Sequence, residues 1–167
     1  MRALSTLIFA SLLTATPSIA AVTAPRVSDS QIVRPLPLPY DEAADADAAV
    51  AAAMKRAKAS HKLLLIDLGG NWCLDCRLLA ATVELPVLRR WLDARFVMVT
   101  VDVGRFDRNL KIPARFGIKG RLAGVPAVLV IDPRTDRLVN AGRVTALADA
   151  RSLSPQGLAD WLGQWVR

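Results

Sequence analysis

Cys73 and Cys76 are the only cysteines of the 167-residue chain, and two residues separate them. They follow the apolar run LLLIDL at 63–68 and precede a stretch with helical spacing, so the sequence places them where a buried strand passes into a helix. Such a pair can exchange disulfides, bind a metal ion or form a structural bridge.

Metal binding and a structural bridge each explain this pair less well than redox exchange. Two thiolates cannot complete a tetrahedral zinc site, and the single histidine, His61, lies before the strand. Cu(I), which accepts thiolate ligands, remains an alternative. A bridge this short restricts the unfolded chain only weakly. The sequence therefore favours a redox-active Cys73–Cys76 couple with no metal and no separate cofactor.

The spacing predicts a different role for each thiol. We expect Cys73 at the start of the helix, where free backbone N–H groups and the helix dipole lower the pKa of a thiol. Cys76 lies one turn further along, within reach of a mixed disulfide formed at Cys73. Cys73 is thus the expected nucleophile and Cys76 the expected resolving thiol.

The elements around the cysteines are expected to alternate between helix and strand. We predict helical segments over 47–59, 77–83, 87–94, 105–116 (broken at Pro113) and from Ser154 onward, and strands over 63–68, 96–101, 127–131 and from Leu138. This order predicts an α/β fold with a mixed central sheet flanked by helices.

The N-terminal segment has the pattern of a secretory signal peptide over residues 1–20. A basic start and a short apolar run over 4–13 precede small residues at Ser18 and Ala20, the −3 and −1 positions of a cleavage site. An uncleaved membrane anchor is the alternative, although the run is shorter than a bilayer span. We expect a Pro-rich, extended arm over 21–40, a folded domain over 41–167, and export to a bacterial periplasm.

The charge distribution argues against a nucleic-acid partner. The formal net charge is +7, but the basic residues are scattered and the chain has a single tyrosine. Nucleic-acid binding surfaces instead gather cations and interleave them with aromatic rings. We therefore expect no nucleic-acid binding. The scattered surface and the lack of an evident spare sheet edge make a monomer the default expectation.

The residues around the cysteines resemble the thioredoxin family, in its exported branch. The resemblance rests on Trp72-Cys73-Leu74-Asp75-Cys76, on Asp67 in the preceding strand and on Gly124-Val125-Pro126 before a later strand, and it covers about 63–167. It implies a thioredoxin-like fold, with Pro126 as a cis-proline facing the cysteines. It also implies that Val125 offers its backbone, and Trp72 its ring, to the substrate.

Asp67 stands where that family carries a buried acid behind the cysteines. Burial in an apolar strand raises the pKa of a carboxyl, so Asp67 could accept the proton of Cys76. An Asp bonded to backbone or water at the end of the strand is the alternative, and an ordinary strand-start proline is the alternative for Pro126.

The chain also departs from the family pattern. Leu74 and Asp75 replace the usual Gly-Pro between the cysteines, and the acid is similar to that of a thioredoxin-related protein with a Trp-Cys-Pro-Asp-Cys motif, which implies narrower substrate choice. Met98 occupies the region where a lysine often accompanies the buried acid, so proton handling at Asp67 is expected to differ. Arg77 is expected to point to solvent.

The direction of electron flow rests on the charges near Cys73. Asp67 and Asp75 disfavour a thiolate there, and a less stable thiolate makes a reductant. The expected function is therefore an exported thiol–disulfide oxidoreductase that reduces disulfides in partner proteins and is recharged by a membrane electron donor. The alternatives are a disulfide oxidase or isomerase, and a redox-inactive copper-binding module on the same fold.

Overall fold

A four-stranded sheet lies at the centre of the computed structural model, which describes residues 23–166. Its strand order is β2-β1-β3-β4. The strands are β1 (Leu63–Gly69), β2 (Phe96–Asp102), β3 (Ala127–Asp132) and β4 (Arg137–Leu138). The helices are α1 (Ala46–Ser60), α2 (Leu74–Val83), α3 (Pro86–Asp93), α4 (Lys111–Ala114) and α5 (Pro155–Gly163), with 3₁₀ turns η1 (Asp29–Gln31) and η2 (Ala150–Ser152). The expected signal peptide lies outside the described residues.

The sheet is mixed, as the sequence predicts. β1 pairs parallel with β2 and antiparallel with β3, and β3 pairs antiparallel with β4. The register places Asp67 of β1 between Thr100 of β2 and Val128 of β3. The acid therefore sits on the most enclosed strand.

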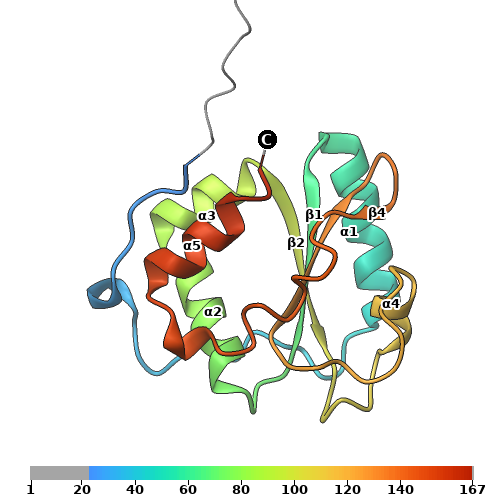
Figure 1. Cartoon of the computed structure of the whole chain (residues 1–167), viewed down its shortest axis with the longest axis horizontal. Coiled ribbons are helices and arrows are strands. Elements are labelled where there is room, and N and C mark those ends of the chain that lie inside the picture. The colour runs from blue at the N-terminus through green and yellow to red at the C-terminus, as the bar shows by residue number, and fades with distance from the viewer. Residues whose placement is uncertain (1–22, 167) are drawn as a thin grey trace, which may run out of the picture.

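Helices cover both faces of the sheet, which makes three layers (Figure 1). Side chains alternate along each strand. Leu64, Ile66 and Leu68 of β1 therefore join α1 and α4 in one apolar core, while Leu65 joins α2, α3 and α5 in the other. In the part of the chain that is described, no helix is long and apolar enough to span a bilayer.

The sequence signals for helix ends agree with the structure. Cys73 is the N-cap of α2, Pro86 is the first residue of α3, and the Ser154 hydroxyl caps α5 by accepting the backbone N–H of Gly157. Proline at the first helical position has no N–H to leave unpaired. The chain therefore breaks between the end of α2 at Val83 and the start of α3 at Pro86.

Two strands differ from expectation. The apolar run over 96–101 predicts a buried strand, but β2 forms an edge of the sheet, and Thr100 on it is exposed. β4 is only two residues long, and beyond it the side chain of the buried Asn140 pairs with the backbone of β3. The Asn140 amide accepts the N–H of Val130 and donates to the carbonyl of Val128, as a neighbouring strand would.

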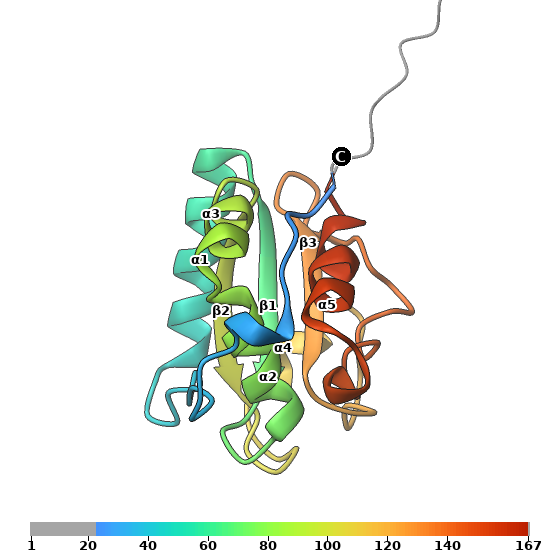
Figure 2. The ribbon, with the colours of Figure 1, turned by 90° about the vertical axis from the view of Figure 1, so that its left-hand side faces the viewer.

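The Pro-rich arm lies on the domain. It starts beside α5, where Gln156 binds the backbone of Val27 and Pro25, and crosses to the α1 side of the sheet (Figures 1 and 2). Most of its side chains are exposed, but Ala24, Val27 and Tyr40 are buried. The arm is thus an extended segment with a few residues inserted into the domain.

Candidate active site

The two thiols meet at the junction of β1 and α2. Both are buried and free, and the backbone N–H of Cys76 donates to the Sγ of Cys73 over 3.2 Å. The Cys73 thiol also lies 3.5 Å from the carbonyl oxygen of Val125. Because Cys73 is the N-cap residue, its sulfur takes the place of a capping oxygen and receives an otherwise unpaired N–H. This end of the helix favours a negative charge on Cys73.

The environment separates the proton affinities of the two thiols. The pKa of Cys73 is lowered to about 7, first by a hydrogen bond from the Cys76 thiol and further by the Cys76 N–H, while burial and the charge of Asp75 oppose this. The pKa of Cys76 is raised far above its ordinary value, first because it shares its proton with Cys73 and next because it is buried. At neutral pH, Cys73 can carry the thiolate while Cys76 keeps its proton.

Asp67 lies behind the pair and is 7% exposed. Burial raises its pKa to about 7; the charge of Cys73 adds to this rise, and a hydrogen bond from Tyr40 partly offsets it. The Tyr40 hydroxyl donates to Oδ2 over 2.9 Å, whereas the buried Oδ1 has no hydrogen-bond partner among residues 23–166. The raised pKa of Asp67, expected from its apolar strand, therefore appears in the structure.

Tyr40 is a site residue that sequence reasoning missed. Its side chain is 3% exposed and contacts both Asp67 and Cys76 from a segment that precedes α1. Burial, then the charge of Asp67, raises the pKa of the Tyr40 phenol far above its ordinary value, so it remains a proton donor. One signal in the sequence could have pointed to Tyr40: it is the single tyrosine of the chain and follows directly after a proline run.

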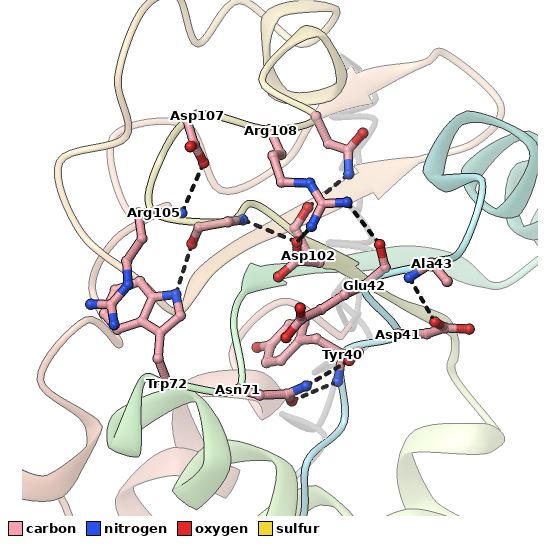
Figure 3. Close-up of polar contacts among 12 residues, drawn as sticks. Tyr40, Asp41, Glu42, Ala43, Asn71, Trp72, Asp102, Arg105, Asp107 and Arg108 are labelled. Atoms are coloured by element: carbon pink, nitrogen blue, oxygen red, sulfur yellow. Dashed lines mark hydrogen bonds and ion pairs between the residues drawn. The ribbon is translucent and has the colours of Figure 1, made fainter.

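Side chains of the domain bind backbone groups at Tyr40 and on both sides of it. Asn71 accepts the Tyr40 N–H and donates to the Tyr40 carbonyl, over 3.1 and 2.7 Å (Figure 3). The Thr100 hydroxyl donates to the Pro39 carbonyl, and Arg108 donates to the Glu42 carbonyl while it pairs with the buried Asp102.

Arg77 corrects one expectation. It was predicted to point to solvent, but its guanidinium donates to the carbonyls of Leu36 and Pro37, over 2.7 and 3.1 Å. A proline-rich segment offers several carbonyls with few N–H groups, which suits a multiple donor such as Arg. Arg77 therefore serves to bind the arm.

The two residues between the cysteines lie in different environments. Leu74 is 48% exposed, whereas Asp75 is buried and binds Arg151. Asp75 Oδ1 accepts both the backbone N–H and the Nε–H of Arg151, over 2.9 and 3.0 Å. The charge of Asp75 raises the pKa of Cys73, as expected, but the hydrogen bonds from Cys76 outweigh it.

Trp72 borders the thiols on the solvent side. It is 40% exposed, and its indole N–H donates to the carbonyl of Gly104 over 2.7 Å. The guanidinium of Arg105 lies 4.6 Å from the centre of the Trp72 ring (Figure 3), and Phe106 lies 5.9 Å from it. The loop after β2 thus fixes the indole beside Cys73.

Val125 and Pro126 lie opposite Trp72, and the peptide bond between them is cis, the geometry that the resemblance implies. With Trp72, Cys73, Leu74 and Phe106, Val125 lines an open groove of about 440 Å³. A second cavity of about 380 Å³ lies among β1, β2, α2 and the arm, and Asp67, Pro37 and Pro39 are among its lining residues. The structure therefore gathers Asp67, Trp72, Cys73, Cys76 and Val125–Pro126 at one place.

The site offers few ligands for a metal ion. Within residues 23–166, no group of three or more His, Cys, Asp or Glu side chains is arranged to hold one. His61 ends α1, and Cys73 and Cys76 lie beyond the opposite end of β1. The copper alternative would have to rest on two thiolates.

Comparisons with known proteins place the chain in a family. Residues 45–133 match the thioredoxin-like family. The crystal structure of a disulphide isomerase from Xylella fastidiosa Temecula1 is 37% identical, with 77% of this chain and 97% of that chain covered and a TM-score of 0.70. A solved structure described as DsbH oxidoreductase is 17% identical over 84% of this chain and 94% of its own, with a TM-score of 0.42. No curated protein matches the chain.

The family match spans more than half of the chain and contains both cysteines, and the isomerase relative aligns over nearly its whole length. The fold prediction is confirmed. The chain belongs to the thioredoxin family and is a thiol–disulfide oxidoreductase.

Proposed function

We propose that the protein reduces disulfides in partner proteins through the Cys73–Cys76 dithiol. The observation that carries this proposal is the position of Cys73 at the N-cap of α2, where its Sγ accepts the Cys76 N–H over 3.2 Å. These surroundings lower the pKa of Cys73 to about 7. Thioredoxin, a reductant, has a nucleophile of similar pKa, whereas the strong oxidant DsbA has one near 3.5. A thiolate of moderate stability leaves the disulfide form of the protein energetically accessible, which favours the donation of electrons.

The first step is attack of the Cys73 thiolate on a substrate disulfide. A bond forms between Cys73 Sγ and one substrate sulfur, the substrate S–S bond breaks, and the other substrate sulfur leaves as a thiolate. The hydrogen bonds that Cys73 receives from Cys76 favour the attacking thiolate at neutral pH.

In the second step Cys76 attacks Cys73, and the mixed disulfide breaks. The Cys73–Cys76 bond forms and the second substrate sulfur leaves, so two electrons have passed from the dithiol to the substrate. Cys76 must lose its proton to attack, and Asp67, whose pKa is about 7, is the proposed acceptor. The cavity beside the arm gives Asp67 a route to solvent while substrate covers Cys73.

The groove beside Cys73 is the proposed substrate site. The backbone of Val125 would pair with an extended segment of the substrate, and the exposed parts of Trp72 and Leu74 would contact its apolar side chains. The groove is shallow and open, so it suits a protein segment with an accessible disulfide.

We also propose that the protein acts in the bacterial periplasm and receives its electrons from a membrane donor. The pattern over residues 1–20 supports export. Disulfides persist in that oxidising compartment, so a reductant there needs a supply of electrons from outside it.

Disulfide isomerisation is the second candidate, because the relative that is 37% identical is described as a disulphide isomerase. Isomerisation begins with the same attack by Cys73 but ends with the substrate attacking its own mixed disulfide. It needs no Cys76, which distinguishes the two functions.

The test is the reduction potential of the protein against a glutathione buffer, combined with turnover of a scrambled-disulfide substrate. A potential at or below about −220 mV and loss of turnover in Cys76→Ser support reduction. A potential near −120 mV would refute it in favour of oxidation. Retained turnover in Cys76→Ser would identify an isomerase, and the lack of any reversible couple would reject redox function.

A further inference from the structure

Tyr40 reaches the dithiol site from outside the segment that matches the family. The match begins at residue 45, yet the Tyr40 hydroxyl lies 2.9 Å from Asp67 Oδ2 and contacts Cys76. The phenol is buried, so its proton points to a partner inside the protein and not to solvent.

Anchors on both sides determine where the phenol lies. Asn71 forms two hydrogen bonds with the Tyr40 backbone (Figure 3). It is the residue two before Cys73, in the turn between β1 and α2. Arg77 of α2 and Thr100 of β2 bind the arm upstream. The hydroxyl is therefore positioned by the elements that carry Cys73, Cys76 and Asp67.

Gly69 provides the space for this approach. A Cβ at residue 69 would lie against the Tyr40 hydroxyl and 2.8 Å from the Cys76 sulfur. Its φ is not in the left-handed region, so close packing accounts for the glycine better than backbone conformation does. The Tyr40 hydroxyl and the Cys76 thiol therefore both border the position of the missing side chain.

Few charged groups surround Asp67. Tyr40 faces it from the arm, Cys73 and Cys76 face it from the start of α2, and the neighbours in register, Thr100 and Val128, carry no charge. Glu84 and Arg89 line the adjoining cavity but pair with each other. Within residues 23–166, the Tyr40 hydroxyl is the only hydrogen-bond donor to the Asp67 carboxyl.

We propose that Tyr40 is a positioning residue for proton transfer at the dithiol. Its hydroxyl holds Oδ2 of Asp67 and leaves Oδ1 free to receive the proton that Cys76 loses when it attacks the mixed disulfide. Tyr40 keeps its own proton throughout, and a strong donor makes the Asp67 carboxylate easier to form between cycles. The arm thereby supplies a neutral donor at a site where Met98 stands in the region expected for a lysine.

The test is a carboxyl-carbon NMR titration of Asp67 in the reduced full chain, with Asp67→Asn to assign the signal. In Tyr40→Phe, loss of the donor should strengthen proton binding by Asp67 about tenfold or more, since hydrogen bonds to charged groups are among the stronger ones. The pH midpoint of the resolving step, followed from a mixed disulfide at Cys73, should move upward by the same amount.

A second variant keeps the ring and its packing. Tyr40 is the only tyrosine of the chain, so growth on fluorotyrosine labels this site alone. A fluorinated phenol is a stronger donor, and the Asp67 midpoint should move downward, opposite to its shift in Tyr40→Phe. The fluorine signal should also titrate together with Asp67.

Thr100→Val is the matched control for loosening of the arm. It removes the hydrogen bond to the Pro39 carbonyl but leaves the phenol in place, so stability should fall without a shift of the Asp67 midpoint. Equal shifts in Thr100→Val and Tyr40→Phe, or an unmoved midpoint in both Tyr40 substitutions, would overturn the proposal.

The proposal rests on the proposed function only for the resolving step. The carboxyl and fluorine titrations need no turnover, so they test Tyr40 even if the protein proves to be an isomerase. Conversely, the protein could show a reversible redox couple while the titration midpoint of Asp67 is the same with and without the Tyr40 hydroxyl. That result would refute the role of Tyr40 and leave the proposed function intact.

Discussion

Asp67→Asn should stabilise the protein at neutral and alkaline pH and have little effect in acid. The pKa of Asp67 is raised from about 3.8 to about 7 by burial, so the folded protein retains a proton that the unfolded chain releases. The wild type consequently loses stability relative to the Asn variant as the pH rises between these two values. The shift is about three pH units, and at 1.36 kcal/mol per unit the gain is about 4 kcal/mol above pH ~8.

The assay is guanidinium unfolding of both reduced proteins at several pH values. The difference in unfolding free energy should be near zero at pH ~4, grow through the neutral range and level off above pH ~8. If the unfolding free energies of the two proteins differed by the same amount at every pH, the reasoning would be refuted. Asp67 would then have the same pKa in the folded and the unfolded protein.

Two controls isolate the effect. Glu42→Gln makes the same chemical change at an exposed carboxylate whose side chain lies outside the site, so its stability difference should stay small at every pH. The comparison of the wild type with Asp67→Asn can also be made in a Cys73→Ser background, which lacks the thiolate whose charge raises the pKa of Asp67. The stability gained by Asp67→Asn should then be slightly smaller.

Three further substitutions test the surroundings of the dithiol. Asn71→Ala removes both hydrogen bonds to the Tyr40 backbone and should cost about 1–3 kcal/mol of unfolding free energy, measured by denaturant titration; an unchanged midpoint would contradict the anchoring. Arg151→Ala leaves the charge of Asp75, near Cys73, without its ion-pair partner. The Cys73 pKa, read from thiolate absorbance, should rise by about a few tenths of a unit, since exposed ion pairs are weak; a fall in this pKa would contradict the prediction. Gly69→Ala forces a methyl group between Tyr40 and the resolving thiol and should cost about 1–3 kcal/mol, with equal stability arguing against that close contact.

The features that could be predicted from the sequence are those with local signals. The strand at 63–68, the helix break at Pro86 and the cap at Ser154 each depend on residues within a few positions, and the structure agrees. The placement of both cysteines at a strand-to-helix junction follows from the same kind of pattern.

The contacts of the arm could not be predicted in this way. Tyr40 and Asp67 are 27 residues apart, and Arg77 and Leu36 are 41 apart, with no periodic pattern that links them. Extended proline-rich chain carries no hydrophobic period, so its docking side depends on tertiary hydrogen bonds to its carbonyls. The place of β2 at the edge of the sheet could not be predicted either, because strand order is not a local property. An edge strand and a central strand can have the same apolar run.

The carbonyls that Asn71, Arg77, Thr100 and Arg108 bind all lie upstream of the first residue of the family match. A recombinant fragment that starts at residue 45 would keep both cysteines and all four main strands, yet it would lack the phenol beside the buried acid. If Tyr40 has the proposed role, such a fragment and the longer chain would differ in the pH dependence of their redox chemistry while sharing every residue of the family motif. The pH profile measured for this protein would then depend on the residue at which the recombinant chain starts.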